Sequence, residues 1–195
     1  MLSKIVLGGV AAHVTISFAS LIHATTCHDF TSESASVSSL LTPSDKNEKF
    51  IAQKVVESMY DNCLVGPKEL LDDNVVFEDP VALCMNRKEV KNAFFLLKYI
   101  SPVRVSRTLY DIRNSEEMQN RKIVIFDQRQ QYSIGRELIL HSHVVVDIDT
   151  NKQKVVRIEE RWNGKKLLLI GYPSRLINGV ISNCLTEVFL AAMNL

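Results

Sequence analysis

One candidate for acid–base chemistry is Asp79, which follows a short apolar strand predicted at residues 75–77. It shares the alternation of Phe77, so the apolar face of this strand leads directly to a carboxyl group. Pro80 ends the hydrogen-bonding ladder of the strand and sets the direction in which the chain leaves it. Two roles are open to Asp79: a general base at the mouth of a cavity, or a side chain that caps the following turn through backbone N–H groups.

A second candidate is Glu160, in a strand predicted at residues 154–162. Alternation puts it on the same face as Val156, Ile158 and Trp162, and we expect this to be the core face. A buried carboxylate is costly unless it is paired with a cation or protonated. Glu160 is therefore either a catalytic acid or base, or a member of a structural ion pair near the end of the strand.

The hydroxyl of Tyr60 is a third candidate, as a hydrogen-bond donor to a molecule held by the two acids. We predict that Asp79 and Glu160 approach one cavity with an apolar lining. That lining is expected to include Phe77, Ile158 and Trp162. Pairing of the acids with Arg87 or Arg161 would instead give them a structural role.

His141 and His143 alternate along a strand predicted at residues 136–149, a spacing that could serve a metal ion or proton transfer. No third ligand accompanies them at a fixed spacing. We expect them on the outer face of the sheet, paired with charged groups or at a dimer contact. The four cysteines form no C-x-x-C pair and no cluster with zinc spacing, so neither a metal site nor a cofactor is predicted.

The elements that position these residues follow from hydrophobic periodicity, which changes from helical to strand-like spacing along the chain. Helices are predicted at 47–62, with Asn47 as the cap, from Gly66 to Leu71, and at 87–99. Strands are predicted at 75–77, 103–112, 121–133, 136–149 and 154–162. Helices followed by a run of strands describe an α+β fold, in which the helices cover one face of an antiparallel sheet.

Two stretches carry a resemblance to a known family. The segment LLDDNVVFEDPVALCMNRKEVKNAFF joins a short strand, an Asp-Pro stop and a helix, and the last strand closes with VVRIEERWNGK. Over residues 47–165 the chain resembles the NTF2-like superfamily, in its SnoaL-like branch. The resemblance implies a cone: a strongly curved antiparallel sheet wrapped around N-terminal helices, with an apolar pocket inside. Isomerases, cyclases, dehydratases and non-catalytic binding or assembly proteins share this fold, so the fold alone selects no function.

The N-terminal part of the chain has a different character. Residues 1–28 contain a charge-free run from 5 to 24, typical of a signal peptide or of an N-terminal membrane anchor. We therefore expect the secretory pathway or a membrane; a mitochondrial location is the alternative, although this run has no arginine. Residues 29–46, which are rich in Ser and Thr, are expected to form a linker.

Residues 166–195 are predicted to form a C-terminal helical extension. Apolar residues recur at helical spacing from Ile177 to Ala192, and charged residues are sparse. We expect this helix to dock onto the domain. Contact with a membrane surface and closure of the pocket are the alternatives.

Composition narrows the functions further. The formal net charge of +1 provides no basic surface, so no nucleic-acid partner is expected. The leading hypothesis is a pocket that binds a small apolar ligand, or a protein partner in or beside it. The alternatives are a cofactor-free isomerase, cyclase or hydrolase that uses Asp79 and Glu160 as acid and base, and a membrane-associated scaffold. A homodimer through the sheet is also predicted.

Overall fold

The computed structural model describes residues 42–64, 66–98, 102–134, 136–164 and 172–193. The predicted signal peptide or anchor, the linker up to residue 41 and residues 165–171 lie outside these ranges. The elements, in chain order, are helix α2 (Pro43–Val56), the π-helical turn η2 (Glu57–Asp61), strands β1 (Leu71–Glu78) and β2 (Leu83–Cys84), helix α3 (Arg87–Leu97), strands β3 (Val103–Asn114), β4 (Arg121–Ile134), β5 (Arg136–Asp149) and β6 (Lys154–Trp162), and helix α4 (Tyr172–Met193).

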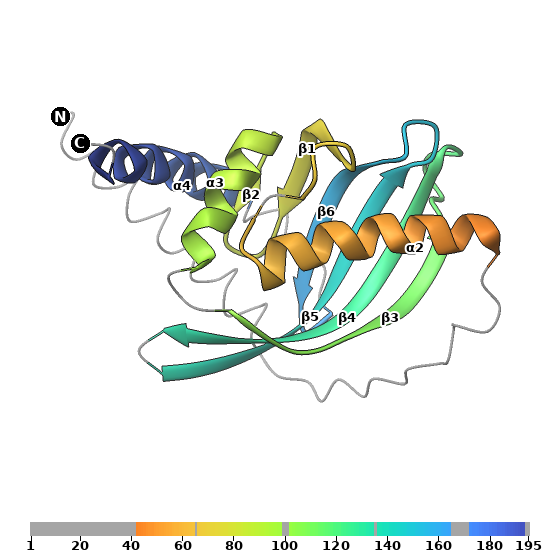
Figure 1. The fold of residues 1–195 in the computed structure, drawn as a ribbon, viewed down its shortest axis with the longest axis horizontal. Coiled ribbons are helices and arrows are strands. Elements are labelled where there is room, and N and C mark those ends of the chain that lie inside the picture. Colours follow the sequence, from red (N-terminus) through yellow and green to blue (C-terminus); the bar gives the residue numbers. More distant parts are fainter. Residues whose placement is uncertain (1–41, 65, 99–101, 135, 165–171, 194–195) are drawn as a thin grey trace.

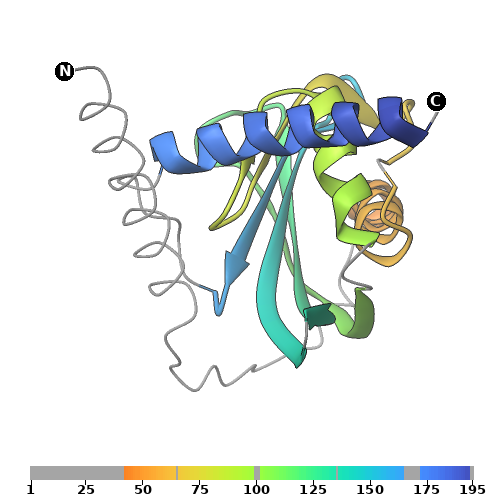
Figure 2. The same ribbon diagram turned by 90° about the vertical axis from the view of Figure 1, so that its left-hand side faces the viewer.

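The six strands form one sheet in the order β2-β1-β6-β5-β4-β3. Helices α2 and α3 lie against one face of this sheet (Figure 1), and α4 runs along the edge made by β1 and β2 (Figure 2). This is the predicted α+β arrangement, with helices on one face of a curved sheet. One pairing differs from the antiparallel prediction. Strand β1 lies parallel to β6, because the long connection through α3 and β3–β5 brings the chain back in the same direction.

Helix α2 begins at Pro43 rather than at Asn47, so the last residues of the expected linker are helical. Thr42 caps this helix: its hydroxyl accepts from the N–H of Asp45 at 3.1 Å, and the Asp45 carboxylate accepts from the N–H of Thr42 at 3.0 Å. This reciprocal capping box satisfies two backbone donors at once. The side chain of Asn47 donates instead to Gln153, in the turn between β5 and β6.

Residues 66–71 do not form the predicted short helix. The N–H of Leu70 donates to the carbonyl of Pro67 at 3.0 Å in a turn, and the chain enters β1 at Leu71. Leu71 is fully buried, and it pairs with Val155 of β6. Strand pairing and burial therefore outweigh the local helical preference, as tertiary context commonly does. As a result, β1 is longer than the strand predicted at residues 75–77.

A bulge in β6 changes which of its side chains face the core. Two consecutive residues of β5 pair with Val155 and Arg157, which leaves Val156 as an extra residue. Val155 is therefore part of the core, and Val156, predicted on the core face, is not. Beyond the bulge the predicted alternation holds, because Ile158 and Glu160 are both buried.

The core lies between the inner face of the sheet and the helices α2 and α3. Side chains from each of these layers contribute to it, among them Ile51, Val55 and Met59 from α2 and η2, Val90 and Phe94 from α3, and Phe77, Phe126, Val144, Val146 and Ile148 from the sheet. Strand β3 departs twice from regular pairing with β4. Such bulges bend and twist a strand, which helps the sheet to curve around the helices.

Helix α4 docks onto the domain through small and polar residues. Gly179 lies so close to the backbone of β2 that a Cβ atom there would be 2.0 Å from the carbonyl oxygen of Leu83. The hydroxyl of Thr186 donates to the carbonyl of Asn92 in α3 at 3.1 Å. Across the residues that the structure describes, no helix is both long enough and apolar enough to span a membrane.

Candidate functional site

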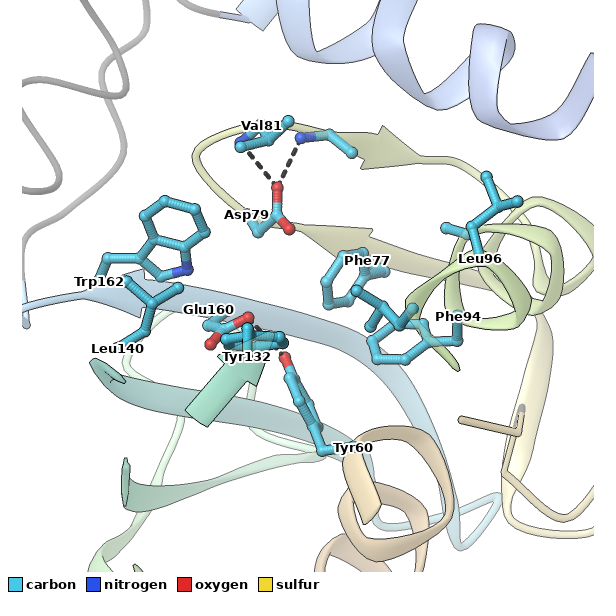
Figure 3. Close-up of a pocket in the computed structure, with 13 residues that line it drawn as sticks. Tyr60, Phe77, Asp79, Val81, Phe94, Leu96, Tyr132, Leu140, Glu160 and Trp162 are labelled. Atoms are coloured by element: carbon cyan, nitrogen blue, oxygen red, sulfur yellow. Dashed lines mark hydrogen bonds between the residues drawn. The ribbon is translucent and has the colours of Figure 1, made fainter. Parts of the chain in front are cut away.

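A cavity of about 420 Å³ lies between the end of β6, the turn from β1 to β2, α3 and η2. The three predicted candidates, Tyr60, Asp79 and Glu160, all line it, and so do Phe77 and Trp162. Figure 3 shows Asp79 and Glu160 pointing into the same space, with Tyr60 reaching toward Glu160. The remaining lining residues are mostly apolar side chains of α3 and of the turn after Asp79.

Ile158, which we predicted in the lining, is not part of it. This residue is fully buried in the core, and it pairs with Phe77 in the sheet. It shares a face with Glu160 but lies one pleat earlier in β6, where packed helices cover the sheet. A common face therefore does not imply a common cavity.

Glu160 is buried, with 3% of its surface exposed, and it is held by two hydroxyl groups. The Tyr60 hydroxyl donates to one carboxylate oxygen at 2.9 Å, and the Ser142 hydroxyl donates to the other at 2.7 Å. Burial, and to a smaller extent the nearby charge of Asp79, raise the pKa of Glu160 to about 7 despite the lowering effect of the two hydroxyls. Neutral and ionised forms of Glu160 therefore coexist near pH 7.

Asp79 serves the turn and faces the cavity at the same time. One of its carboxylate oxygens accepts from the N–H of Val81 at 2.7 Å and from the N–H of Ala82. The capping role considered from the sequence is therefore present. Burial raises the pKa of Asp79 to about 6, although the two backbone donors and the charge of Arg175 act to lower it.

The neighbouring carboxylates of β1 have opposite environments. Glu78 accepts from Arg175 of α4 at 2.6 Å and from Arg157 of β6 at 2.9 Å, so it forms a buried ion-pair network. Asp79, one residue later, points to the other side and lines the apolar cavity. This alternation explains the two adjacent acids at the end of β1. Glu78 holds α4 to the sheet, and Asp79 points into the cavity.

The arginines considered as partners of the two acids bind elsewhere. Arg87 lies 3.5 Å from Asp73, and Arg161 donates to Glu159 at 2.7 Å on the outer side of β6. Within the described residues, no ion pair to Glu160 is formed. The cavity therefore keeps a carboxyl group without a cationic partner, which is the condition that raises a pKa by burial.

Tyr60 is positioned by the π-helical turn η2 at the end of α2. Gln130 of β4 donates to the Tyr60 carbonyl at 3.1 Å, and the Tyr60 ring meets Phe94 edge-to-face with 5.2 Å between ring centroids. Burial and the charge of Glu160 raise the pKa of Tyr60 well above its ordinary value, so the phenol stays protonated and donates its hydrogen bond.

Trp162 places an indole N–H at the cavity, in addition to the hydroxyls of Tyr60 and Ser142. Its indole N–H is buried and makes no hydrogen bond within the described residues, yet it lies close enough to Glu160 to lower the pKa of that carboxyl. Ser142, Tyr132 and Leu140 also belong to the site, and none of them was predicted from the sequence. A serine among inward-facing apolar residues of β5 was the available signal for Ser142.

The two histidines of β5 lie on the outer face of the sheet, away from the cavity. His141 contacts the carboxylate of Asp127, and the ring of His143 packs against Tyr110 with 4.6 Å between centroids. Burial lowers the pKa of His143. The described residues contain no group of three or more His, Cys, Asp or Glu side chains that could hold a metal ion.

Among known proteins, this chain is similar to solved structures, and the similarity lies in the fold. No family model and no curated protein matches the chain. A provisionally named isomerase from Bacillus subtilis matches with a TM-score of 0.46 at 18% identity, over 62% of this chain and 89% of that one. A provisionally named SnoaL-like polyketide cyclase from Shewanella denitrificans matches with a TM-score of 0.42 at 8% identity, over 59% and 89%.

A third match is an NTF2-like protein of unknown function from Cytophaga hutchinsonii, with a TM-score of 0.40 at 8% identity, over 59% of this chain and 88% of that one. These likenesses concern the fold alone. The chain itself places helices against the inner face of a curved six-stranded sheet, with a cavity beside them. This is the arrangement that the resemblance of its sequence to the NTF2-like superfamily implies.

Proposed function

We propose that the cavity binds a small, largely apolar molecule that carries a carbonyl or hydroxyl group, and that Glu160 exchanges a proton with it. The observation that carries the proposal is the state of Glu160: a buried carboxyl with a pKa of about 7, held by two hydroxyls and lining an apolar cavity. A general base is most effective when its pKa lies near the working pH.

The other polar groups of the cavity support the same chemistry. When the Glu160 carboxylate takes a proton from the carbon next to a carbonyl, the C–H electron pair forms a C=C bond, and negative charge develops on the carbonyl oxygen. The unpartnered indole N–H of Trp162 is a donor for that oxygen. Tyr60 and Ser142 hold the carboxylate in place, and Asp79 supplies a second acid with a raised pKa.

A binding pocket without catalysis is the second candidate. Asp79 supports it, because its contacts with the N–H groups of Val81 and Ala82 already give it a structural role. The mostly apolar lining would then retain a ligand through burial of apolar surface. The two candidates differ in one measurable property, which is whether a bound molecule exchanges a proton.

The test uses 2-tetralone, a small bicyclic ketone with exchangeable hydrogens beside its carbonyl. Exchange of these hydrogens for deuterium in D₂O is followed by ¹H NMR with the full chain, with Glu160→Gln and with Glu159→Gln. Glu159 is the matched control, because it lies next to Glu160 in β6 but binds Arg161 on the outer face. We expect the wild type and Glu159→Gln to accelerate exchange, with a rate that rises with pH through about 7 as Glu160 ionises.

Glu160→Gln should lose this acceleration while still binding the ketone. Binding is measured separately, from the change of Trp162 fluorescence as 2-tetralone is added. A wild type that binds the ketone but exchanges it no faster than Glu160→Gln would refute the catalytic part and favour the binding pocket. A wild type that shows no binding would contradict both candidates for ligands of this class.

A further inference from the structure

In helix α4 the charged residues contact the domain, whereas several apolar residues are exposed. Its sequence from 172 to 193 contains two charged residues, Arg175 and Glu187. Arg175 is buried and donates to Glu78 of β1 at 2.6 Å, and Glu187 pairs with Lys88 of α3 at 2.6 Å. Both charges of the helix are thus used in contacts with the domain.

The opposite side of α4 is apolar and exposed. Ile177, Val180 and Ile181 keep 45%, 49% and 45% of their surface accessible, and Cys184 is exposed as well. These four positions follow the i, i+3, i+4, i+7 spacing of one helical face. We call them the α4 stripe. Single exposed aliphatic residues are common on proteins, but a continuous stripe marks a surface that another apolar phase covers.

The polar and close backbone contacts of α4 with the domain lie away from the stripe. Gly179 and Thr186 make the contacts with β2 and α3 on the far side of the helix. Those contacts, together with the ion pair between Arg175 and Glu78, hold α4 in a fixed orientation. The stripe is therefore presented outward by the docking itself.

We propose that the α4 stripe lies on the surface of an anionic lipid bilayer. An interfacial helix buries an apolar face at the boundary of the acyl chains while basic residues meet the headgroups. Lys91 is exposed on α3, the helix that packs beside α4, and provides positive charge there, whereas Lys88 is paired with Glu187. The buried ion pair of Arg175 with Glu78 keeps α4 attached to the domain, which suits a helix lying on the membrane.

The sequence before the domain favours this occupant over others. Residues 5–24 carry no charge, and about 20 apolar residues suffice to span a bilayer. Residues 25–41 would connect such an anchor to α2, and an extended chain of that length reaches at most roughly 60 Å. The domain would therefore stay close to the bilayer. A second copy is disfavoured, because four side chains fall well short of the ~800 Å² that each partner buries in a stable interface.

The test places a fluorescent reporter on the stripe of the full chain. Cys184 is the exposed cysteine of the described part, whereas Cys63 and Cys84 are buried, so a Cys27→Ser background allows Cys184 to be labelled with the polarity-sensitive dye NBD. Vesicles of phosphatidylcholine and phosphatidylserine are then added. We expect a blue shift of NBD emission and quenching by doxyl groups attached to the lipid acyl chains.

A matched control carries the dye at Asn151→Cys, in the exposed turn between β5 and β6, with Cys184→Ser. This label should show neither the shift nor the quenching. The double variant Val180→Glu/Ile181→Glu, labelled at Cys184, should lose both signals even if an N-terminal anchor still brings the chain to the vesicles. Circular dichroism confirms that this variant keeps its fold.

Three results would overturn the proposal. A blue shift without vesicles that grows with protein concentration would identify a second copy as the occupant. A blue shift without vesicles at every concentration would identify a segment of the same chain. Emission that stays typical of water when vesicles are present would show that lipid does not contact the stripe.

Discussion

Replacement of Glu160 by Gln should change how the stability of the protein depends on pH. The pKa of Glu160 is raised in the folded chain, from an ordinary 4.5 to about 7. A carboxyl with a raised pKa stabilises the folded state while it is protonated. This contribution is fully present below pH 4.5 and is lost as the pH rises through about 7. Gln is neutral at every pH, so the variant lacks this loss.

The size of the effect follows from the same values. One pKa unit corresponds to about 1.4 kcal/mol. The rise from 4.5 to about 7 therefore predicts that the wild type loses on the order of 3 kcal/mol of unfolding free energy across this range through Glu160. Asp79, with a pKa raised to about 6, adds a loss of the same sign, and the two neighbouring groups titrate as a coupled pair.

The assay is urea unfolding of wild type, Glu160→Gln and the control Glu159→Gln at a series of pH values from 4.5 to 8. Gln at position 160 can still accept from Tyr60 and can donate to Ser142, so we expect the variant to fold. The stability of Glu160→Gln minus that of the wild type should rise by about 3 kcal/mol over the series. An unchanged difference at all pH values would refute the raised pKa and show that the two hydroxyls stabilise an ionised Glu160.

Further outcomes follow from the packing of α4 and the cavity, each measured by urea unfolding at constant pH. Arg175→Met should cost about 3 kcal/mol, because it leaves the buried Glu78 with one partner in place of two; no loss would show that this network is not needed. Gly179→Ala should cost about 2 kcal/mol, since its Cβ would meet the Leu83 carbonyl at 2.0 Å; a stabilised variant would contradict this contact. Trp162→Ala should cost about 2 kcal/mol, below the ~3–5 kcal/mol of a fully buried Trp, because Trp162 is only partly buried at the cavity. The same variant should bind 2-tetralone more weakly. A loss of unfolding free energy above about 4 kcal/mol would place Trp162 in the core.

Local patterns in the sequence were sufficient for the α+β class and for five of the cavity residues: Tyr60, Phe77, Asp79, Glu160 and Trp162. Alternation along β1 and β6 puts Asp79 and Glu160 on faces that continue apolar residues, and this depends only on strand geometry. Helical spacing likewise predicted α2, α3 and α4. These features are local, since each depends on neighbours a few positions away along the chain.

The same alternation was wrong where strand geometry becomes irregular. The bulge at Val156 moves Val155 into the core, and it arises from the pairing of β6 with β5, which no single strand reveals. Ile158 shows the second limit. It lies on the predicted face, but the helices above it determine that it is packed in the core and does not line the cavity.

The chemical state of the acids was determined by contacts between distant parts of the chain. Tyr60 and Glu160 share a hydrogen bond although they are 100 residues apart. Arg175 of α4 forms its ion pair with Glu78 and not with Asp79. The sequence by itself determined which residue types stand on which face of a strand, because backbone geometry repeats every two residues. Only the tertiary structure decided which carboxyl is neutralised by a cation and which enters an apolar cavity with a raised pKa, because burial and pairing depend on what packs against the strand.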